Sequence, residues 1–288
     1  MKNVVAFSGG KDSLATLLWV IENYGKENPV IIFCDTGWES LVTYEHITEI
    51  EKQIGIKFTV LKSEKYKDFH DLSVKKKRVA STKARFCTEE LKVKPMIDFI
   101  LSLKEHCIVY QGIRKDESKS RSQMTQHCQY FKYYTQPKRE DKKGKLVYDN
   151  YRKKDVLAHI KEYSVEITRP IFEWTANQVF DFIKEKGFEA NPLYKQGFDR
   201  VGCFPCIMCR HKEIVNIAKK YPERIERIKE LEEELGRSFF PPDYIPKWAC
   251  ANGEYPMIED VIKYKNINSG QEELFDAPSC ESIYNICE

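Results

Sequence analysis

The sequence predicts an α/β protein in which a doubly wound, mostly parallel sheet is followed by a cysteine-rich, mainly helical C-terminal region. Short apolar runs alternate with helical stretches from residue 4 to residue 183, a pattern typical of parallel strands joined by helices. The first apolar run leads through two glycines directly into a helix. Three closely spaced cysteines then precede a long, charged stretch of helical pattern. We find no internal repeat.

The composition is that of a soluble globular protein. The 288 residues are 42% hydrophobic and 32% charged, and the net charge is +3. No apolar run approaches membrane length, and no charged-then-apolar leader precedes the first strand. We therefore expect a cytoplasmic protein, whose ten cysteines are thiols or metal ligands rather than disulfides.

The first element is a buried strand at residues 4–7, which runs into the sequence SGGKDS at residues 8–13. Two glycines let the backbone turn tightly and approach a ligand. A helix follows at once, because Leu14, Leu17, Leu18 and Ile21 repeat at helical spacing. Its free N–H groups and positive dipole end suit a phosphate. An ordinary glycine turn without a ligand is the alternative, but six residues in register between strand and helix favour a nucleotide phosphate loop.

The next elements continue the alternation. Further strands are expected at residues 29–35, 57–61 and 107–110, with a short fifth at 165–167 and 170–171, and a helix at 41–54. Asp35 ends the second strand, where a parallel sheet delivers side chains to its binding crevice.

Two stretches are basic. Residues 62–94 hold eleven Lys or Arg against five Asp or Glu, and residues 132–154 hold nine against three. Aromatic residues accompany the second stretch, which suits a nucleic acid because charge meets phosphate and rings stack on bases. The alternative is a solvated insertion at about 132–155, with a hairpin tip at Gly144.

The second half begins with a helix capped by Thr175 and Gln178 and ended near Gly187. Residues 211–235 are helical in pattern. Beyond residue 242 we expect irregular structure, with Trp248 packing the tail back. The expected domains are residues 1–200, which bind the nucleotide, and residues 201–288, which carry the cysteines and the helical tail.

The cysteines at 203, 206 and 209 form C-x2-C-x2-C, a spacing that brings several sulfurs around one centre. One more ligand is needed, and the candidates are Cys87, Cys250 and, for zinc, His211. Four thiolates suit both zinc and an iron–sulfur cluster, so spacing leaves the metal open.

Five motifs, in order and across residues 1–210, resemble the phosphoadenosine phosphosulfate (PAPS) reductase family, which belongs with the PP-loop ATP pyrophosphatases. They are SGGKDS at 8–13, Asp35-Thr36-Gly37, Cys87 with Lys92 and Pro95, Gly112-Ile113-Arg114 with Ser118 and Arg121, and Asn191-Pro192-Leu193-Tyr194 leading through Gly197 to Cys203. The resemblance implies the adenine-nucleotide α-hydrolase-like sheet and a ligand such as ATP, adenosine phosphosulfate (APS) or PAPS.

The resemblance also implies roles for single residues. The pyrophosphate would be held by Ser8, Gly9, Gly10 and Ser13, with Gly112 beside them. Phosphate charge would be neutralised by Lys11, Arg114 and Arg121, together with Mg²⁺. Asp12 and Asp35 would position the metal or the ribose.

Iron–sulfur members of the family hold a [4Fe-4S] cluster through a CC pair and a later C-x-x-C. Here Cys87 matches the first position of the pair, Thr88 stands at the second, and Cys209 is additional. The implied ligands are Cys87, Cys203, Cys206 and Cys209, with Cys250 in reserve for Cys87 and zinc as the alternative metal.

The C-terminal end departs from the family. Assimilatory reductases carry an E-C-G-[IL]-H segment whose cysteine attacks the sulfonate, and this tail has Cys280 and Cys287 without that motif. We therefore predict an ATP-dependent sulfur transferase, similar to the enzymes of DNA phosphorothioation or tRNA thiolation, whose basic stretches dock a nucleic-acid acceptor and which needs a sulfur donor. The alternatives are an APS or PAPS reductase fed by thioredoxin, and a non-catalytic nucleotide-binding subunit with a structural metal site.

Overall fold

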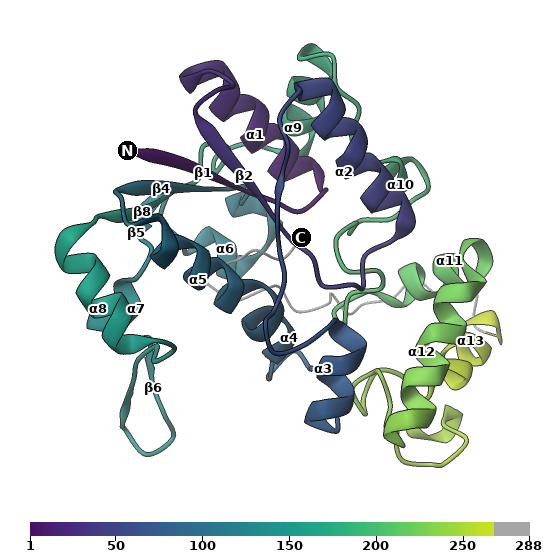
Figure 1. The fold of residues 1–288 in the computed structure, drawn as a ribbon. Helices are drawn as coiled ribbons and strands as arrows, with labels where there is room; N and C mark the ends of the chain where they lie inside the picture. Colours follow the sequence, from purple (N-terminus) through teal and green to yellow (C-terminus); the bar gives the residue numbers. More distant parts are fainter. Residues whose placement is uncertain (268–288) are drawn as a thin grey trace.

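The computed structural model describes residues 1–267. A six-stranded sheet lies at its centre, between helices (Figure 1). Its strand order is β3 (Thr59–Leu61), β2 (Pro29–Cys34), β1 (Lys2–Phe7), β4 (Cys107–Gln111), β8 (Val165–Thr168) and β5 (His127–Gln129). All neighbouring strands pair in parallel except β5, which runs antiparallel at the edge. The predicted α/β class and mostly parallel sheet are therefore confirmed.

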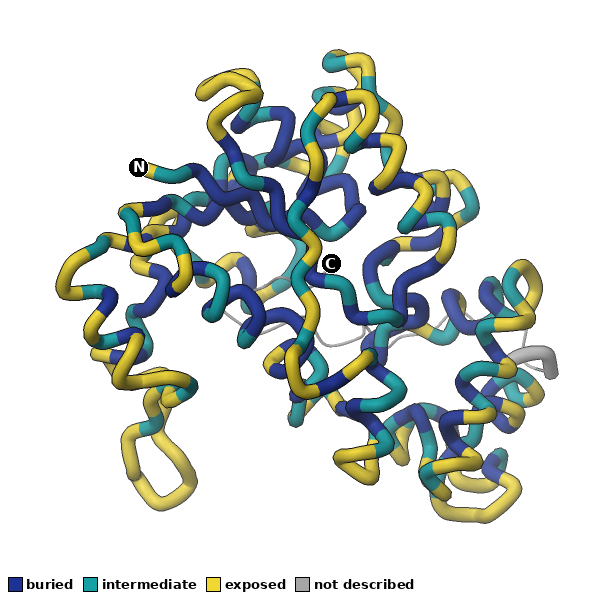
Figure 2. Tube along the Cα trace, viewed as in Figure 1, coloured by how far each residue is buried: buried dark blue, intermediate teal, exposed yellow. Residues whose placement is uncertain are grey.

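Helices cover both faces of the sheet because the side chains of β1 alternate between them. Val5 and Phe7 pack into one apolar cluster with α1 (Lys11–Tyr24), α2 (Leu41–Ile54) and α9 (Ala176–Glu185). Val4 and Ala6 pack into the other with α5 (Lys94–Leu103), α7 (Lys132–Thr135) and α8 (Lys153–Glu162). Figure 2 shows the resulting buried strands between half-exposed helices.

A third apolar cluster joins the C-terminal helices to the loops after β2 and β3. The helices involved are α3 (Phe69–Lys76), α10 (Pro192–Lys195), α11 (His211–Lys220), α12 (Pro222–Leu235) and α13 (Ile258–Ile267). The predicted cysteine-rich C-terminal region and the domain boundary at residue 200 stay predictions, and Cys280 and Cys287 lie outside the described residues.

Shorter elements complete the chain. They are α4 (Phe86–Thr88), the π-helical turn η1 (Glu89–Val93), the 3₁₀ turns η2 (Lys115–Glu117) and η3 (Lys247–Ala249), α6 (Lys119–Ser122), and the hairpin of β6 (Arg139–Glu140) and β7 (Leu146–Val147). The hairpin projects from the body of the molecule (Figure 1), and Gly144 at its tip has a φ of 75°. The hairpin predicted around this glycine is therefore confirmed.

Several predicted elements differ from the structure at their ends or in kind. Strand β3 covers only 59–61, residues 170–171 lie in a turn, and the edge strand β5 was not expected. Strand β5 has the sequence His-Cys-Gln, which is too short and too polar to give an apolar signal. The charged stretch 211–235 is two helices, because Pro222 lacks the N–H that would continue α11.

The prediction that Trp248 packs the tail back is wrong. Its side chain is 79% exposed and its ring lies 5.7 Å from that of Tyr264. The core beneath this segment is filled by Phe239, Phe240 and Ile245, so the 3₁₀ turn after Pro246 leaves Trp248 outside. Within residues 1–267, no helix is both long and apolar enough to cross a membrane.

The buried carboxyl of Glu232 makes the stability of the C-terminal helices depend on pH. It accepts hydrogen bonds from the backbone N–H groups of Phe239 at 2.7 Å and Ile258 at 2.8 Å. Burial raises its pKa from 4.5 to about 7, although these hydrogen bonds lower it. The folded state therefore binds the proton more tightly, and the stability gained from this is present below pH 4.5 and lost as the pH rises through about 7.

We expect this group to cost wild-type protein about 3 kcal/mol of unfolding free energy between pH 5 and pH 8. Urea unfolding at the two pH values, in wild type and Glu232→Gln, measures the difference. The glutamine variant should lack this part of the pH dependence, and an unchanged dependence would contradict the assignment.

Candidate active site

The SGGKDS loop lies at the carboxyl end of β1, and the N-terminus of α1 follows it directly. The hydroxyl of Ser13 donates to the carbonyl of Gly10 at 2.9 Å and accepts from the backbone N–H of Ser8 at 3.2 Å. Ser8 and Ser13 also share a hydrogen bond between their hydroxyls at 3.1 Å. These bonds hold the loop in a tight turn at a helix N-terminus, the arrangement that binds phosphates.

Two glycines are required by geometry. Gly9 has a φ of 82°, and a Cβ there would lie 2.7 Å from Cγ2 of Thr43. A Cβ at Gly112, just after β4, would lie 2.5 Å from the backbone carbonyl carbon of Asp12 and 2.6 Å from the backbone nitrogen of Ser13. The loop after β4 therefore packs directly on the phosphate loop, and only glycine allows this approach.

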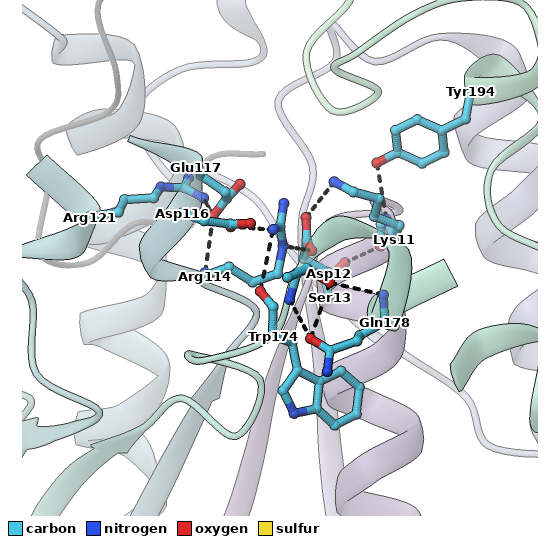
Figure 3. Close-up of polar contacts among 12 residues, drawn as sticks. Lys11, Asp12, Ser13, Arg114, Asp116, Glu117, Arg121, Trp174, Gln178 and Tyr194 are labelled. Atoms are coloured by element: carbon cyan, nitrogen blue, oxygen red, sulfur yellow. Dashed lines mark hydrogen bonds and ion pairs between the residues drawn. The ribbon is translucent and has the colours of Figure 1, made fainter. Parts of the chain in front are cut away.

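Asp12 lies between two cations, as Figure 3 shows. Its Oδ2 is 2.6 Å from Nζ of Lys11, and its Oδ1 accepts a hydrogen bond of 2.6 Å from Nε of Arg114. Asp12 is 0% exposed, so both cations are held where the helix begins. Burial lowers the pKa of Arg114, but the charge and hydrogen bond of Asp12 outweigh this, so the pKa is raised overall.

The second arginine is held by a different carboxylate. Arg121, on α6, pairs with Glu117, while Arg114 also pairs with Asp116 and donates to the carbonyl of Trp174 (Figure 3). Both arginines are buried, and their elements follow β4 at the same edge of the sheet. In this structure, then, the acids of one loop set the directions in which two predicted phosphate-binding cations point.

Residues far along the chain form hydrogen bonds with the phosphate loop. Asn191 is fully buried and its amide donates to the carbonyl of Gly9 at 3.2 Å and to the hydroxyl of Thr43 at 3.3 Å. The hydroxyl of Tyr194 accepts from the backbone N–H of Lys11 at 3.0 Å. The Asn-Pro-Leu-Tyr motif at 191–194 therefore contacts the loop from the far end of the predicted domain.

Asp35 follows β2 at the neighbouring position on the sheet edge. It accepts hydrogen bonds from Tyr44 at 2.6 Å and from the backbone of Gly37 at 2.9 Å, and Nζ of Lys62 lies 3.0 Å away. Burial raises the pKa of Asp35, but these three partners outweigh burial and lower it overall. The carboxylate is thus ionised at the carboxyl end of the strand that pairs with β1.

Three cysteines line one cavity, which we call the thiol cavity. Cys87 comes from α4, and Cys203 and Cys206 come from the loop before α11. The cavity has a volume of about 30 Å³, room for about one or two water-sized groups. Its other lining residues are Thr36, Trp38, Phe69, Arg85, Thr88, Leu91, Lys92, Arg200, Pro205 and Ile207.

The thiol cavity adjoins the carboxyl edge of the sheet through the loop after β2. We call this edge, which carries the SGGKDS loop and Asp35, the nucleotide edge. The hydroxyl of Thr36, next to Asp35, lies 3.8 Å from Sγ of Cys203 and donates to Glu39 at 2.6 Å. On the other side, Nη1 of Arg200 lies 3.9 Å from Sγ of Cys206. Burial raises the pKa of Cys203, and Lys92 acts against it.

The four predicted cluster ligands are not all brought together. Cys209 is buried and is not among the residues that line the thiol cavity. Its backbone carbonyl accepts a hydrogen bond of 3.0 Å from the hydroxyl of Tyr244. The thiol of Cys250 faces the carbonyl of Pro246 at 3.7 Å. Within residues 1–267, no three His, Cys, Asp or Glu side chains are grouped so that they could hold a metal ion. In these positions the thiols do not fit a [4Fe-4S] or zinc site. The predicted metal site therefore stays a prediction.

Sequence reasoning missed three residues of this region. Glu39 accepts from Thr36 and from the backbone of Trp38 at 3.2 Å, and it pairs with Cys203 across an isolated β-bridge. Arg200 stands beside Cys206, and Thr36 lines the cavity itself. No spacing signal marks Glu39 or Arg200. Thr36, however, lies inside the Asp35-Thr36-Gly37 motif and could have been found there.

The chain is similar to several known proteins. The chain is 28% identical to an uncharacterized 37.8 kDa protein of Escherichia phage 186, over 99% of this chain and 96% of that one. It is 30% identical to an uncharacterized protein of Methanocaldococcus jannaschii over 78% of this chain, which spans only 40% of that longer relative. A phosphoadenylyl-sulfate reductase structure from Candida auris aligns with a TM-score of 0.47 and 16% identity, covering 71% of this chain and 81% of that one.

The family model that matches is the phosphoadenosine phosphosulfate reductase domain, over residues 2–209. The match spans the phosphate loop, the arginine loop after β4, the Asn-Pro-Leu-Tyr motif and all three cysteines of the triplet. This chain therefore belongs to the phosphoadenosine phosphosulfate reductase domain family.

Proposed function

We propose that the chain is an ATP-dependent sulfur transferase that activates an acceptor by adenylation. The carrying observation is that Thr36 connects the nucleotide edge of the sheet with the thiol cavity: it follows Asp35 in the chain, and its hydroxyl lies 3.8 Å from Sγ of Cys203. A nucleotide-activated atom and a sulfur nucleophile have to meet, and this arrangement would hold the two in neighbouring positions.

The proposed reaction has two steps. First, an oxygen of the acceptor attacks the α-phosphorus of ATP, and the bond to the β-phosphate breaks to release pyrophosphate. Second, a hydrosulfide sulfur attacks the atom that carries the new O–AMP group, and AMP leaves with the oxygen. The sulfur keeps its oxidation state throughout. With a persulfide donor, the terminal sulfur would first pass to the thiol of Cys203, and the Cys203 persulfide would attack the same atom as AMP leaves. A second thiol would then attack the Cys203 sulfur, form a disulfide with it and release the thiolated acceptor.

Different residues would bind the phosphates and the sulfur. The N–H groups at the start of α1, with Ser8 and Ser13, would hold the pyrophosphate as it leaves. Lys11, Arg114 and Arg121 would neutralise its charge, and bound Mg²⁺ would share that task. Phosphate oxygens would compete with Asp12 for Lys11. The thiols of Cys87, Cys203 and Cys206 would accept the transferred sulfur from the donor, since thiolates are the nucleophilic form of cysteine.

An APS or PAPS reductase is the second candidate, and the family match supports it. The same phosphate loop would then hold a sulfonucleotide, and a thiol would attack the sulfonate sulfur. The phosphate loop serves both reactions, so the substrate decides between them. The basic stretches favour the first candidate, because a small sulfonucleotide gives them no partner.

Wild-type protein should release pyrophosphate and AMP from ATP when supplied with hydrosulfide and a pool of RNA and single-stranded DNA, and nucleoside mass spectrometry should find sulfur in the acceptor. Lys11→Ala should slow pyrophosphate release about 100-fold, because it removes a charge that stabilises the leaving group. Lys26→Ala, at an exposed lysine beyond α1, is the matched control. Sulfite release from APS with a dithiol reductant, without ATP cleavage, would identify a reductase instead.

A further inference from the structure

The two basic stretches, far apart in the sequence, line a single groove, which we call the basic groove. Its volume is about 510 Å³. One wall is formed by residues around α4 and η1, and the other by the segments on either side of the β6–β7 hairpin. The lining residues are Arg78, Thr82, Lys83, Ala84, Arg85, Phe86, Thr88, Glu89, Val93, Lys94, Ile97, Tyr134, Lys138, Arg139, Asp149, Asn150 and Tyr151.

The groove carries an excess of positive charge. Six of its lining residues are Lys or Arg and two are Asp or Glu. Lys94 pairs with Glu89 and Glu90, and Lys138 pairs with Asp149 at 3.1 Å. These pairs account for both acids of the lining. Arg78, Lys83 and Arg139 are exposed on the rim, so the groove attracts a chain of negative charges.

Aromatic rings form part of the same lining. The guanidinium of Arg78 lies 5.3 Å from the ring centroid of Phe86, and Nζ of Lys94 lies 5.1 Å from that of Tyr151. The hydroxyl of Tyr134 donates to the carbonyl of Tyr151 at 2.6 Å, which fixes the two residues against each other. Cations interleaved with rings are typical of sites that bind phosphates and unstacked bases together.

The basic groove adjoins the thiol cavity. Arg85 and Thr88 line both. Between them, α4 separates the two spaces: Phe86 and Thr88 line the groove, while Cys87 lines the thiol cavity. Nη2 of Arg85 donates to the hydroxyl of Thr88 at 3.3 Å, so a cation stands at the junction. A ligand in the groove would thus lie on one side of α4, with the thiol of Cys87 on the other.

We propose that the basic groove binds single-stranded nucleic acid and presents one nucleotide to the thiol cavity. The volume matches a pocket for one small ligand. A duplex keeps its bases stacked inside and would touch only the rim, whereas an unpaired strand can place a base against Tyr151, the half-buried ring of the lining. This inference rests on the proposed function, because it supplies the acceptor of the sulfur.

The test is a binding measurement that contains no ATP. Fluorescence anisotropy with labelled single-stranded DNA and RNA oligonucleotides, and with a duplex of the same sequence, should show tighter binding of the single strands. Their affinity should fall with salt, with a slope of about −0.7 in log–log form for each phosphate contact. Lys83→Glu with Arg139→Glu should weaken binding about 10- to 100-fold at moderate salt. Lys26→Glu with Lys212→Glu, at surface lysines that do not line the groove, should leave it unchanged.

Each outcome of this test supports or contradicts the proposed binding site. Equal affinity of the groove variant and wild type would overturn the inference, as would equal binding of the duplex or of heparin, a polyanion without bases. Failure to bind single strands while ATP cleavage continues would refute the groove and leave the ATP chemistry intact. Binding by Lys11→Ala at wild-type affinity, with sulfur transfer lost, would separate the groove from the phosphate loop.

Discussion

Alanine at position 112 should weaken ATP binding and slow pyrophosphate release about 100-fold, because a misplacement of about 1 Å of the reacting groups costs that much in rate. The added Cβ would lie 2.5–2.6 Å from the backbone of Asp12 and Ser13. Backbone atoms at the start of α1 cannot rotate away as a side chain could, so the phosphate loop itself has to move. Overpacking of this kind also costs about 1–3 kcal/mol of unfolding free energy.

A pyrophosphate assay, calorimetric titration of ATP and thermal unfolding of Gly112→Ala measure the effects on rate, affinity and stability. Gly144→Ala is the control, because it places a Cβ at a φ of 75° in open space at the hairpin tip. That variant should bind ATP as wild type does. Wild-type affinity in Gly112→Ala would mean that the loop after β4 does not set the position of the phosphate loop.

With a persulfide donor, serine at position 203 should slow sulfur transfer about 100-fold or more, while pyrophosphate release continues at the wild-type rate. A hydroxyl replaces the thiol at nearly the same size, but it is neither a comparable nucleophile nor a soft metal ligand. Cys203 is the thiol that contacts the nucleotide edge, through Thr36, so its loss separates the two half-reactions.

Nucleoside mass spectrometry and a pyrophosphate assay on the same samples give the two rates. Cys128→Ser, on the edge strand β5 and outside the thiol cavity, is the matched control and should transfer sulfur normally. Iron and zinc analysis of anaerobically purified wild type and Cys203→Ser adds a test of the metal prediction. Full transfer by Cys203→Ser would remove the thiol from the mechanism, and equal metal content in both would remove it as a ligand.

Much of the fold could be predicted because local patterns report it directly. The helix expected at 41–54 has those bounds in the structure, and the cap of α9 is the expected pair, with the Gln178 side chain accepting from Thr175 at 2.8 Å. Both depend on residues within one or two turns of each other. Strand β5 and the exposed position of Trp248 could not be predicted in this way, because sheet pairing and competition for core space decide them.

The features of the candidate site were likewise predictable only where they depend on neighbouring residues. The sequence alone determined the phosphate loop, since strand, glycine turn and helix are consecutive, and it marked the cysteines by their spacing. Only the tertiary structure decided that Asp12 lies between Lys11 and Arg114, that Cys209 lies outside the thiol cavity, and that two basic stretches share one groove. The physical reason is that short-range backbone geometry is encoded by neighbours, whereas side-chain partners are chosen by packing between segments distant in the chain.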